Sequence, residues 1–173
     1  FNDIDNGIKV KVSSVTKLSN KSSMIKSKSV SNYINSQMAK CEAIDSGVDD
    51  AILLDDEGYV AEGTAASVFI VKNSILYTPP NDNSLKSITQ MTVLEIAKVL
   101  GLKVVRKRIT REELYIADEV FFTGTAIEIS SIREIDKRKI GKNNYPISKK
   151  LRNKYFEIVK GSDKLFEKCL TYV

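Results

Sequence analysis

Apolar and polar residues alternate in several short runs along the chain, and this pattern predicts strands. Residues 8–15 alternate over their first half, and the Ser-, Lys- and Asn-rich residues 16–27 are expected to form a loop. The other predicted strands are also short and are bounded by turn residues such as Asn73. The full set of predicted strands is 8–15, 51–55, 58–62, 67–72, 74–78, 102–107 and 119–124.

Two longer helices are predicted from capping residues and helical spacing. Ser31 is a candidate N-cap for a helix that runs to about Ser46. Ser87 and Gln90 have the spacing of a capping box, and they predict a helix that ends at Gly101. The apolar faces expected for these two helices are Ile34, Met38 and Cys41 on the first, and Val93, Ile96, Ala97 and Leu100 on the second.

Two further helix starts complete the pattern. Thr110 and Glu113 form a second capping-box pattern before a short helix, and Ser148 is a candidate N-cap for a last helix. The residues expected on the apolar face of the last helix are Leu151, Tyr155, Ile158 and Val159. Because hairpins and isolated helices are mixed along the chain, the pattern favours an α+β fold.

The composition is that of one folded domain without a strong preference for a polyanion. The chain has 173 residues, and 42% of them are apolar, which is enough to build a core. Lys and Arg number 27 against 22 Asp and Glu, and the net charge of +5 is scattered along the chain. A nucleic-acid-binding module needs basic residues gathered on one face with exposed aromatics, so it ranks last among the alternatives.

The cysteines and the lack of histidine restrict the chemistry. Cys41 and Cys169 are the only cysteines, neither stands in a CxxC pattern, and no metal site is expected; Cys41 is expected in a helix core. Without histidine a Ser-His-Asp hydrolase is excluded, and proton transfer must use Lys, a carboxylate, Tyr, Cys or a cofactor. The sequence contains no secretory signal or membrane-spanning run and begins at Phe1 as a trimmed chain would, so a cytoplasmic location is expected.

Four short segments, in their order along the chain, resemble the cofactor half of a known enzyme family. They are 28–33 (Lys-Ser-Val-Ser-Asn-Tyr), 58–63 (Gly-Tyr-Val-Ala-Glu-Gly), 85–89 (Leu-Lys-Ser-Ile-Thr) and 117–126 (Ala-Asp-Glu-Val-Phe-Phe-Thr-Gly-Thr-Ala). Over residues 7–173 the chain resembles the fold-type IV (class IV) pyridoxal-phosphate-dependent aminotransferases, and residues 114–129 are most similar to the branched-chain-amino-acid aminotransferases. The resemblance implies the α+β C-terminal large domain of these enzymes, a strand-rich pseudo-barrel with flanking helices.

The resemblance assigns a catalytic lysine and two polar partners. Lys28 stands where the family has the lysine that forms the Schiff base with pyridoxal 5′-phosphate and moves the proton in transamination, which requires a pKa below the usual ~10.4. Lys26 is the competing candidate, and the register of Asn32 and Tyr33 favours Lys28. Tyr33 corresponds to the tyrosine that hydrogen-bonds the phenolic oxygen of the cofactor, and Glu62 to the glutamate that pairs with the pyridine nitrogen. Without the resemblance these residues would be interpreted as a solvated lysine, a helix aromatic and a turn glutamate.

The remaining assignments concern the cofactor phosphate and the substrate carboxylate. Ile88 and Thr89 follow a serine cap, so their N–H groups are unpaired at a helix N-terminus, which is an anion site on physical grounds. The resemblance implies that the phosphate binds there, with Leu85 in the same cofactor-binding segment. It also implies that Thr125 reaches the phosphate, and that the N–H groups of Thr125 and Ala126 receive the substrate α-carboxylate.

Two segments depart from the family pattern. Residues 64–67 are Thr-Ala-Ala-Ser where the family has a small residue followed by Gly-Glu-Asn, so Ala65 adds a methyl group where the cofactor ring packs. Residues 85–91 keep the Ile-Thr pair of the anion site and change the turn before it. These departures leave open a degenerate domain that binds a cofactor or a partner without turnover.

The activity that the resemblance implies is transamination of branched-chain L-amino acids with 2-oxoglutarate as the amino acceptor. Residues 1–27 are then the interdomain connection and first strand, and residues 28–173 the cofactor domain; the small N-terminal domain is expected to be absent from this chain. A homodimer is expected, with amino acids and 2-oxo acids as ligands and neither nucleic acid nor membrane as a partner. The enzyme alternative is a lyase on the same scaffold, such as aminodeoxychorismate lyase.

Overall fold

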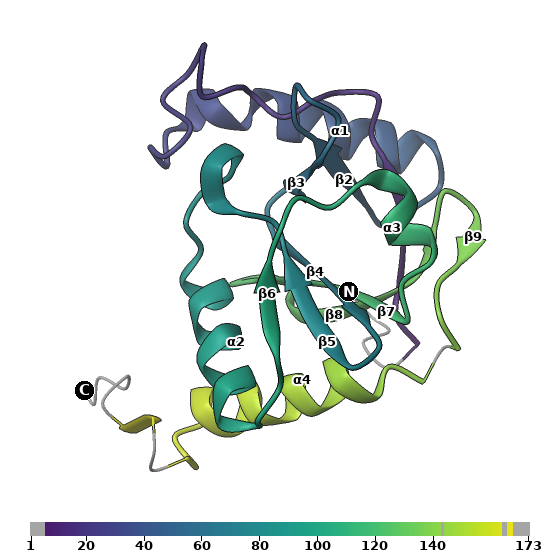
Figure 1. Ribbon diagram of the computed structural model, residues 1–173. Coiled ribbons are helices and arrows are strands. Elements are labelled where there is room, and N and C mark those ends of the chain that lie inside the picture. The colour runs from purple at the N-terminus through teal and green to yellow at the C-terminus, as the bar shows by residue number, and fades with distance from the viewer. Residues whose placement is uncertain (1–5, 143, 164–165, 168–173) are drawn as a thin grey trace.

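The central feature of the fold is one curled, mixed β-sheet with helices on both sides (Figure 1). The computed structural model describes residues 6–142, 144–163 and 166–167. The strands of this part are β1 (Ile8–Val12), β2 (Asp50–Leu54), β3 (Val60–Gly63), β4 (Ser67–Lys72), β5 (Ile75–Thr78), β6 (Val104–Arg106), β7 (Glu119–Gly124), β8 (Glu128–Ile135) and β9 (Arg138–Lys139). The helices are α1 (Ile34–Asp45), α2 (Ile88–Val99), α3 (Arg111–Tyr115) and α4 (Pro146–Val159), with 3₁₀ turns η1 (Val30–Tyr33) and η2 (Asn81–Asn83).

The sheet closes most of the way on itself. Its strand order is β3-β2-β1-β8-β7-β4-β5-β6, with β9 beside β8. β1 runs parallel to both of its neighbours, and β5 runs parallel to β6; the other pairs are antiparallel. The chain after β6 returns to β3 at the other end of the order, where Val60 N–H donates to the Ile109 carbonyl at 2.8 Å. This curled sheet with flanking helices confirms the predicted α+β fold.

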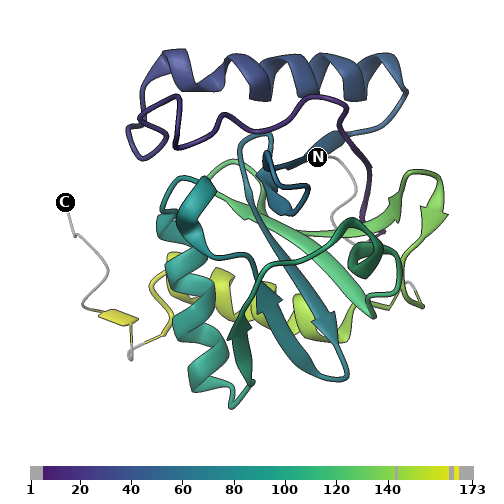
Figure 2. The same cartoon turned by 45° about the horizontal axis from the view of Figure 1, so that its top comes forward.

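Apolar side chains fill the inside of the curl and cover its outer face. Strands that are far apart in the sheet order contribute to the inner core, for example Val60 of β3 and Ile70 of β4. On the outer face, Phe69 and Phe121 stack at 5.1 Å under α2 and α4. Figure 2 shows α4 and α2 on one side of the sheet and α1 on the opposite side. Within the part of the chain that the structure describes, no helix has the length and apolar character needed to cross a bilayer.

The predicted strands agree with the structure apart from their ends, and two strands, β8 and β9, were missed. The strand predicted over 8–15 ends at Val12, and the strand predicted over 102–107 spans only Val104–Arg106. The longer of the two missed strands is β8. Its buried Ser130 and Ser131 interrupt the apolar alternation that would have revealed it.

The apolar face predicted for α1 is wrong, because that face points to solvent. Ile34 and Met38 are 54% and 53% exposed, and Cys41 is exposed rather than in the core. The buried face of α1 instead contains small residues such as Ala39 and Ala43, which pack closely on β2. The start is also wrong, since Ser31 lies inside η1 and does not cap α1.

Two of the predicted helix starts are confirmed. Ser87 caps α2 by accepting the Gln90 N–H at 3.2 Å, although the Gln90 side chain bonds Thr78 rather than completing a capping box. Thr110 and Glu113 form a full capping box at the start of α3. Val93, Ile96 and Ala97 of the predicted inner face of α2 are fully buried, with Leu100 partly buried against the same core.

The predicted cap of the last helix is wrong in a way that shows a long-range contact. Helix α4 begins at Pro146, so Ser148 lies inside its first turn. The Glu119 carboxylate of β7 accepts the N–H groups of Ile147 and Ser148 and the Ser148 hydroxyl, each at 2.8 Å. A buried glutamate from the sheet therefore satisfies the helix start. On the predicted apolar face Leu151, Tyr155 and Ile158 are buried, whereas Val159 is 50% exposed.

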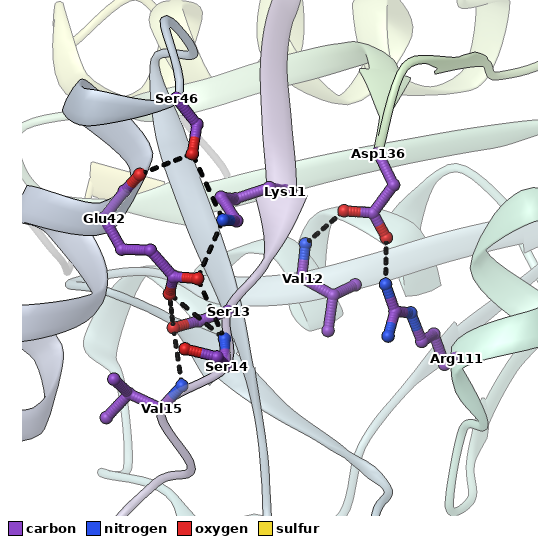
Figure 3. Close-up of polar contacts among 9 residues, drawn as sticks. All are labelled: Lys11, Val12, Ser13, Ser14, Val15, Glu42, Ser46, Arg111 and Asp136. Atoms are coloured by element: carbon purple, nitrogen blue, oxygen red, sulfur yellow. Dashed lines mark hydrogen bonds and ion pairs between the residues drawn. The ribbon is translucent and has the colours of Figure 1, made fainter.

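A polar cluster fastens α1 to β1 (Figure 3). Glu42 of α1 accepts hydrogen bonds from the Lys11 ammonium at 2.7 Å, the Ser13 hydroxyl at 2.5 Å and the Ser14 N–H at 3.0 Å. Burial alone would raise the pKa of Glu42, but these donors together lower it from 4.5 to about 2. Since Tyr33 is the N-cap of α1, this cluster also sets the position of the segment before the helix.

Candidate active site

Most of the predicted site residues meet in one cavity of about 310 Å³ between the loop before α1 and the N-terminus of α2. The predicted residues that line it are Lys28, Tyr33, Glu62, Leu85, Ile88 and Thr125. They come from four segments that are separated in the sequence, and the fold brings these segments together. Thr89 and Ala126 do not line this cavity.

Lys28 lies in the loop before η1, and the side chain of Asn32 shapes that loop. The Asn32 amide donates to the carbonyls of Met24 at 2.9 Å and Ser27 at 2.8 Å, and its oxygen accepts the Ser23 hydroxyl at 2.8 Å. These three bonds hold the backbone directly before Lys28. The amine of an exposed lysine is therefore presented from a fixed loop at the rim of the cavity.

Glu62 lies in the buried strand β3, and the next residue must be glycine. A Cβ at Gly63 would stand 2.9 Å from the ring of Phe122, closer than real contacts allow. Gly63 N–H also donates to the Ala66 carbonyl at 2.6 Å, which closes the turn of residues 64–66 over the cavity. Ala65, one of the departures from the family pattern, lines the cavity from this turn.

The carboxylate of Glu62 is nearly buried and has two donors. The Lys17 ammonium lies 2.5 Å from Glu62 Oε1, and the Leu85 N–H also hydrogen-bonds the carboxylate. Burial is the largest effect and holds the pKa of Glu62 above its ordinary value, although Lys17, Leu85 and the nearby Lys26 act in the opposite direction. Leu85 thus has a role that the sequence did not reveal, since its backbone holds the predicted partner of the pyridine nitrogen.

The N-terminus of α2 forms the opposite wall. Ile88 is the first helical residue and lines the cavity, and its N–H group has no partner within the helix. The Thr89 hydroxyl contacts the Ser87 hydroxyl at 2.8 Å, and Thr89 itself is buried. The helix start predicted at Ser87 is therefore present, and the Thr89 side chain supports the cap; that it binds an anion stays a prediction.

Thr125 and Ala126 follow β7, and they belong to two adjoining cavities. Thr125 lines the first cavity with Gly124, where a Cβ would stand 3.1 Å from the Ala65 carbonyl. Ala126 lines a second cavity of about 380 Å³, to which Tyr33 and Ala65 also contribute. Tyr33 therefore stands between the predicted cofactor position and the predicted substrate position.

The cavity has a cationic lining with one acidic group. Among the described residues that line it, Lys17, Lys28 and Lys86 are cations and Glu62 is the one carboxylate. Such a balance suits a ligand that carries several negative charges at one end and a cationic nitrogen at the other. A nucleophilic amine, a buried carboxylate and a helix N-terminus around one cavity are the groups that amine-transfer chemistry on a phosphorylated cofactor requires.

Sequence reasoning missed two residues of the site. Lys17 was placed only within the loop predicted over residues 16–27, and its side chain is only 9% exposed. Asn32 was used for register alone and not as the side chain that holds the Lys28 loop. Lys17 acts through a contact with Glu62, which is distant in the sequence, whereas Asn32 bonds residues 23–27 of its own loop.

The fold is that of the class IV aminotransferase family. The sequence profile of the family described as Amino-transferase class IV matches residues 2–135, and the chain belongs to this family.

Several similar proteins are named branched-chain-amino-acid aminotransferases. The branched-chain-amino-acid aminotransferase of Pseudomonas aeruginosa is 47% identical over 171 residues, which are 98% of this chain and 56% of that protein. The crystal structure of the branched-chain aminotransferase from the archaeon Thermoproteus uzoniensis with norvaline superposes with a TM-score of 0.93 at 42% identity, covering 96% of this chain and 56% of that one. The branched-chain amino acid aminotransferase from Thermobaculum terrenum, solved in its PLP-form, gives a TM-score of 0.92 at 40% identity, covering 96% of this chain and 55% of that one. The chain spans about half the length of the relatives it matches.

Proposed function

We propose that this chain is the cofactor-holding part of a pyridoxal-phosphate-dependent aminotransferase that acts on branched-chain L-amino acids with 2-oxoglutarate as the amino acceptor. The observation that carries the proposal is the single cavity in which Lys28, Glu62 and the α2 N-terminus at Ile88 meet. The branched-chain substrate class comes from the names of the relatives.

The cavity fits pyridoxal 5′-phosphate in size and in charge. Its volume of about 310 Å³ lies at the lower end of the range of about 300–1,000 Å³ usual for ligand pockets. The α2 N-terminus and the cationic side chains suit a phosphate, and the buried Glu62 carboxylate suits a pyridinium nitrogen. When bound, this cofactor supplies an aldehyde that takes up an amino group and a ring that accepts electrons.

Each protein group then has a role in binding or proton movement. Lys28 Nζ is the amine that holds the cofactor at rest and afterwards takes the proton from the substrate Cα. Tyr33 donates from its hydroxyl to the phenolic oxygen, and Glu62 Oε keeps the ring nitrogen protonated. The Ile88 N–H and the Thr125 hydroxyl bind the phosphate, with Thr89 supporting the helix start.

The substrate is held beside Tyr33, where the two cavities adjoin. In this proposal the N–H groups of Thr125 and Ala126 would receive the α-carboxylate, and Lys28 lines the adjoining cavity. The amino donor and the 2-oxo acceptor each carry an α-carboxylate, so both would bind at the same position in their half-reactions.

The domain division and the partners belong to the same proposal. A small domain that precedes the first strand would account for the greater length of the relatives and would complete the side-chain pocket. Residues 1–27 would hold the interdomain connection and the first strand, residues 28–173 would form the cofactor domain, and the protein would work as a cytoplasmic homodimer. β1 already lies inside the sheet between β2 and β8, so the connection ends before Ile8 in structural terms.

The test is a half-reaction on the natural full-length protein loaded with pyridoxal phosphate. L-Leucine should convert the bound cofactor to pyridoxamine phosphate with release of the matching 2-oxo acid, and Lys28→Ala should abolish this. The matched control is Lys21→Ala, because Lys21 is exposed and its ammonium pairs with Asp56, away from the cavity. Release of pyruvate from an aminated chorismate would instead favour the lyase, and binding of the cofactor without turnover would favour a degenerate domain.

A further inference from the structure

Lys17 and Glu62 form an ion pair at the wall of the cavity, and the proposed function gives a role to Glu62 but none to Lys17. Their side chains are 9% and 11% exposed, and Nζ lies 2.5 Å from Oε1. The backbone of Lys17 is also fixed, because its N–H donates to the Leu54 carbonyl of β2 at 2.8 Å. Lys17 lines the cavity together with Glu62, so the pair stands at the wall where the pyridine ring is placed.

We propose that Lys17 is a positioning residue of the cofactor site, which keeps Glu62 in its anionic form and directs its free lone pairs into the cavity. The inference rests on the proposed function, since it assigns the pyridine nitrogen as the group that Glu62 meets. Lys17 does not touch the reacting atoms; it acts through Glu62.

The physical reason is the cost of a buried charge. A carboxylate that is removed from water without a countercharge takes up a proton instead. The Lys17 ammonium and the Leu85 N–H are the two donors that oppose this at Glu62. A carboxylate offers about four lone-pair positions, so it can keep both donors and still accept a third from the ring nitrogen.

Other charges around Glu62 cannot replace Lys17. The Lys26 ammonium acts on Glu62 only through its charge and donates to the Ser84 carbonyl at 3.1 Å. Lys28 and Lys86 line the same cavity but have no ion pair with Glu62 among the described contacts. Lys17 is therefore the cation in contact with the carboxylate.

The consequence is a change in the number of protons taken up on binding. Under this proposal Glu62 of the natural protein is a carboxylate before binding, so no proton has to leave it when the ring nitrogen binds. With Lys17→Met, Glu62 carries a proton before binding and gives it to the ring nitrogen, or to solvent where the ring nitrogen is already protonated. Because the bound state is the same, the variant takes up fewer protons, by on the order of one.

The experiment uses the natural full-length protein and 4′-deoxypyridoxine 5′-phosphate, an analogue without the aldehyde, so that proton changes at Lys28 are avoided. Proton uptake is measured at pH 7 by titration calorimetry in two buffers of different ionisation enthalpy. Lys17→Met is expected to take up on the order of one proton fewer than the natural protein, and Lys17→Arg the same number as the natural protein. Equal uptake by all three folded proteins would overturn the proposal.

An infrared measurement covers the case in which Lys17→Met does not bind the analogue. In the cofactor-free variant a protonated carboxyl band should be present, and it should disappear on further change of Glu62→Gln. Absence of that band in a variant with a native circular dichroism spectrum would also overturn the role of Lys17. Failure of the natural protein to bind the analogue would count against the proposed function, whereas the infrared result concerns Lys17 alone.

Discussion

The Glu42 cluster gives a prediction with a defined pH dependence. Glu42→Gln removes the charge that joins α1 to Lys11 and to Ser13 (Figure 3). The pKa of Glu42 is lowered from 4.5 to about 2, so its charged form stabilises the folded state above pH 4.5. This contribution is lost as the pH falls from 4.5 towards 2.

The magnitude follows from the lowered pKa of Glu42 and from its exposure. Linkage gives at most about 3 kcal/mol for a fall in pKa of this size. The side chain of Glu42 is 25% exposed, and solvent screening reduces the expected loss to about 1–2 kcal/mol at pH 7. Near pH 2 Glu42 loses its charge, so Glu42→Gln should there cause little change in the free energy of unfolding.

The assay is urea unfolding followed by circular dichroism at pH 7, 5 and 3. The control is Glu57→Gln, because the Glu57–Arg108 ion pair at 2.5 Å has side chains that are 44% and 52% exposed. That control should lose less than about 0.5 kcal/mol. A loss for Glu42→Gln that is no larger than the control, or that is equal at pH 7 and pH 3, would show that the Glu42 charge does not stabilise the fold.

Three further predictions concern the walls of the site and the helix starts. Gly63→Ala should cost about 1–3 kcal/mol and lower the thermal midpoint, because its Cβ would meet the Phe122 ring at 2.9 Å; an unchanged midpoint would mean that the ring moves aside freely. Ser87→Ala should cost about 1 kcal/mol and weaken pyridoxal phosphate binding in a fluorescence titration, while Ser87→Thr should restore both. Glu119→Ala should cost roughly 2–4 kcal/mol in urea unfolding, because it leaves the start of α4 without its buried acceptor, and Glu119→Gln should cost less.

The parts of the fold that the sequence predicted are those governed by local rules. The capping of α2 by Ser87, the capping box of Thr110 and Glu113, and the hairpin around Asn73 all depend on residues a few positions apart. The buried strand over 119–124 was equally clear, because it is a continuous apolar run.

The errors arose where tertiary contacts outweigh local pattern. On α1 the larger apolar residues face solvent, and Ala39 and Ala43 face the sheet because only small side chains allow α1 to approach β2 so closely. At α4 the helix start is satisfied by Glu119 from β7, which no local spacing could show. β8 was missed because buried serines lie where alternation would place apolar residues.

The difference between local patterns and tertiary contacts also separates the residues of the candidate active site. Lys28, Glu62 and Ile88 were located from short segments, and the structure places them around one cavity. Lys17 could not be found in this way, because its role exists only through the contact with Glu62. A buried lysine on a predicted loop has no sequence signal that distinguishes it from a solvated one.

The most direct test of the central claim is to find which lysine attaches pyridoxal phosphate. The natural full-length protein is titrated with the cofactor, the adduct is reduced with borohydride, and the modified peptide is mapped. We expect the absorption band of the bound cofactor to saturate at about one equivalent of pyridoxal phosphate per chain. We also expect the modification on Lys28. A modification on Lys26, one spread over several lysines, or none at all in a folded protein would contradict it.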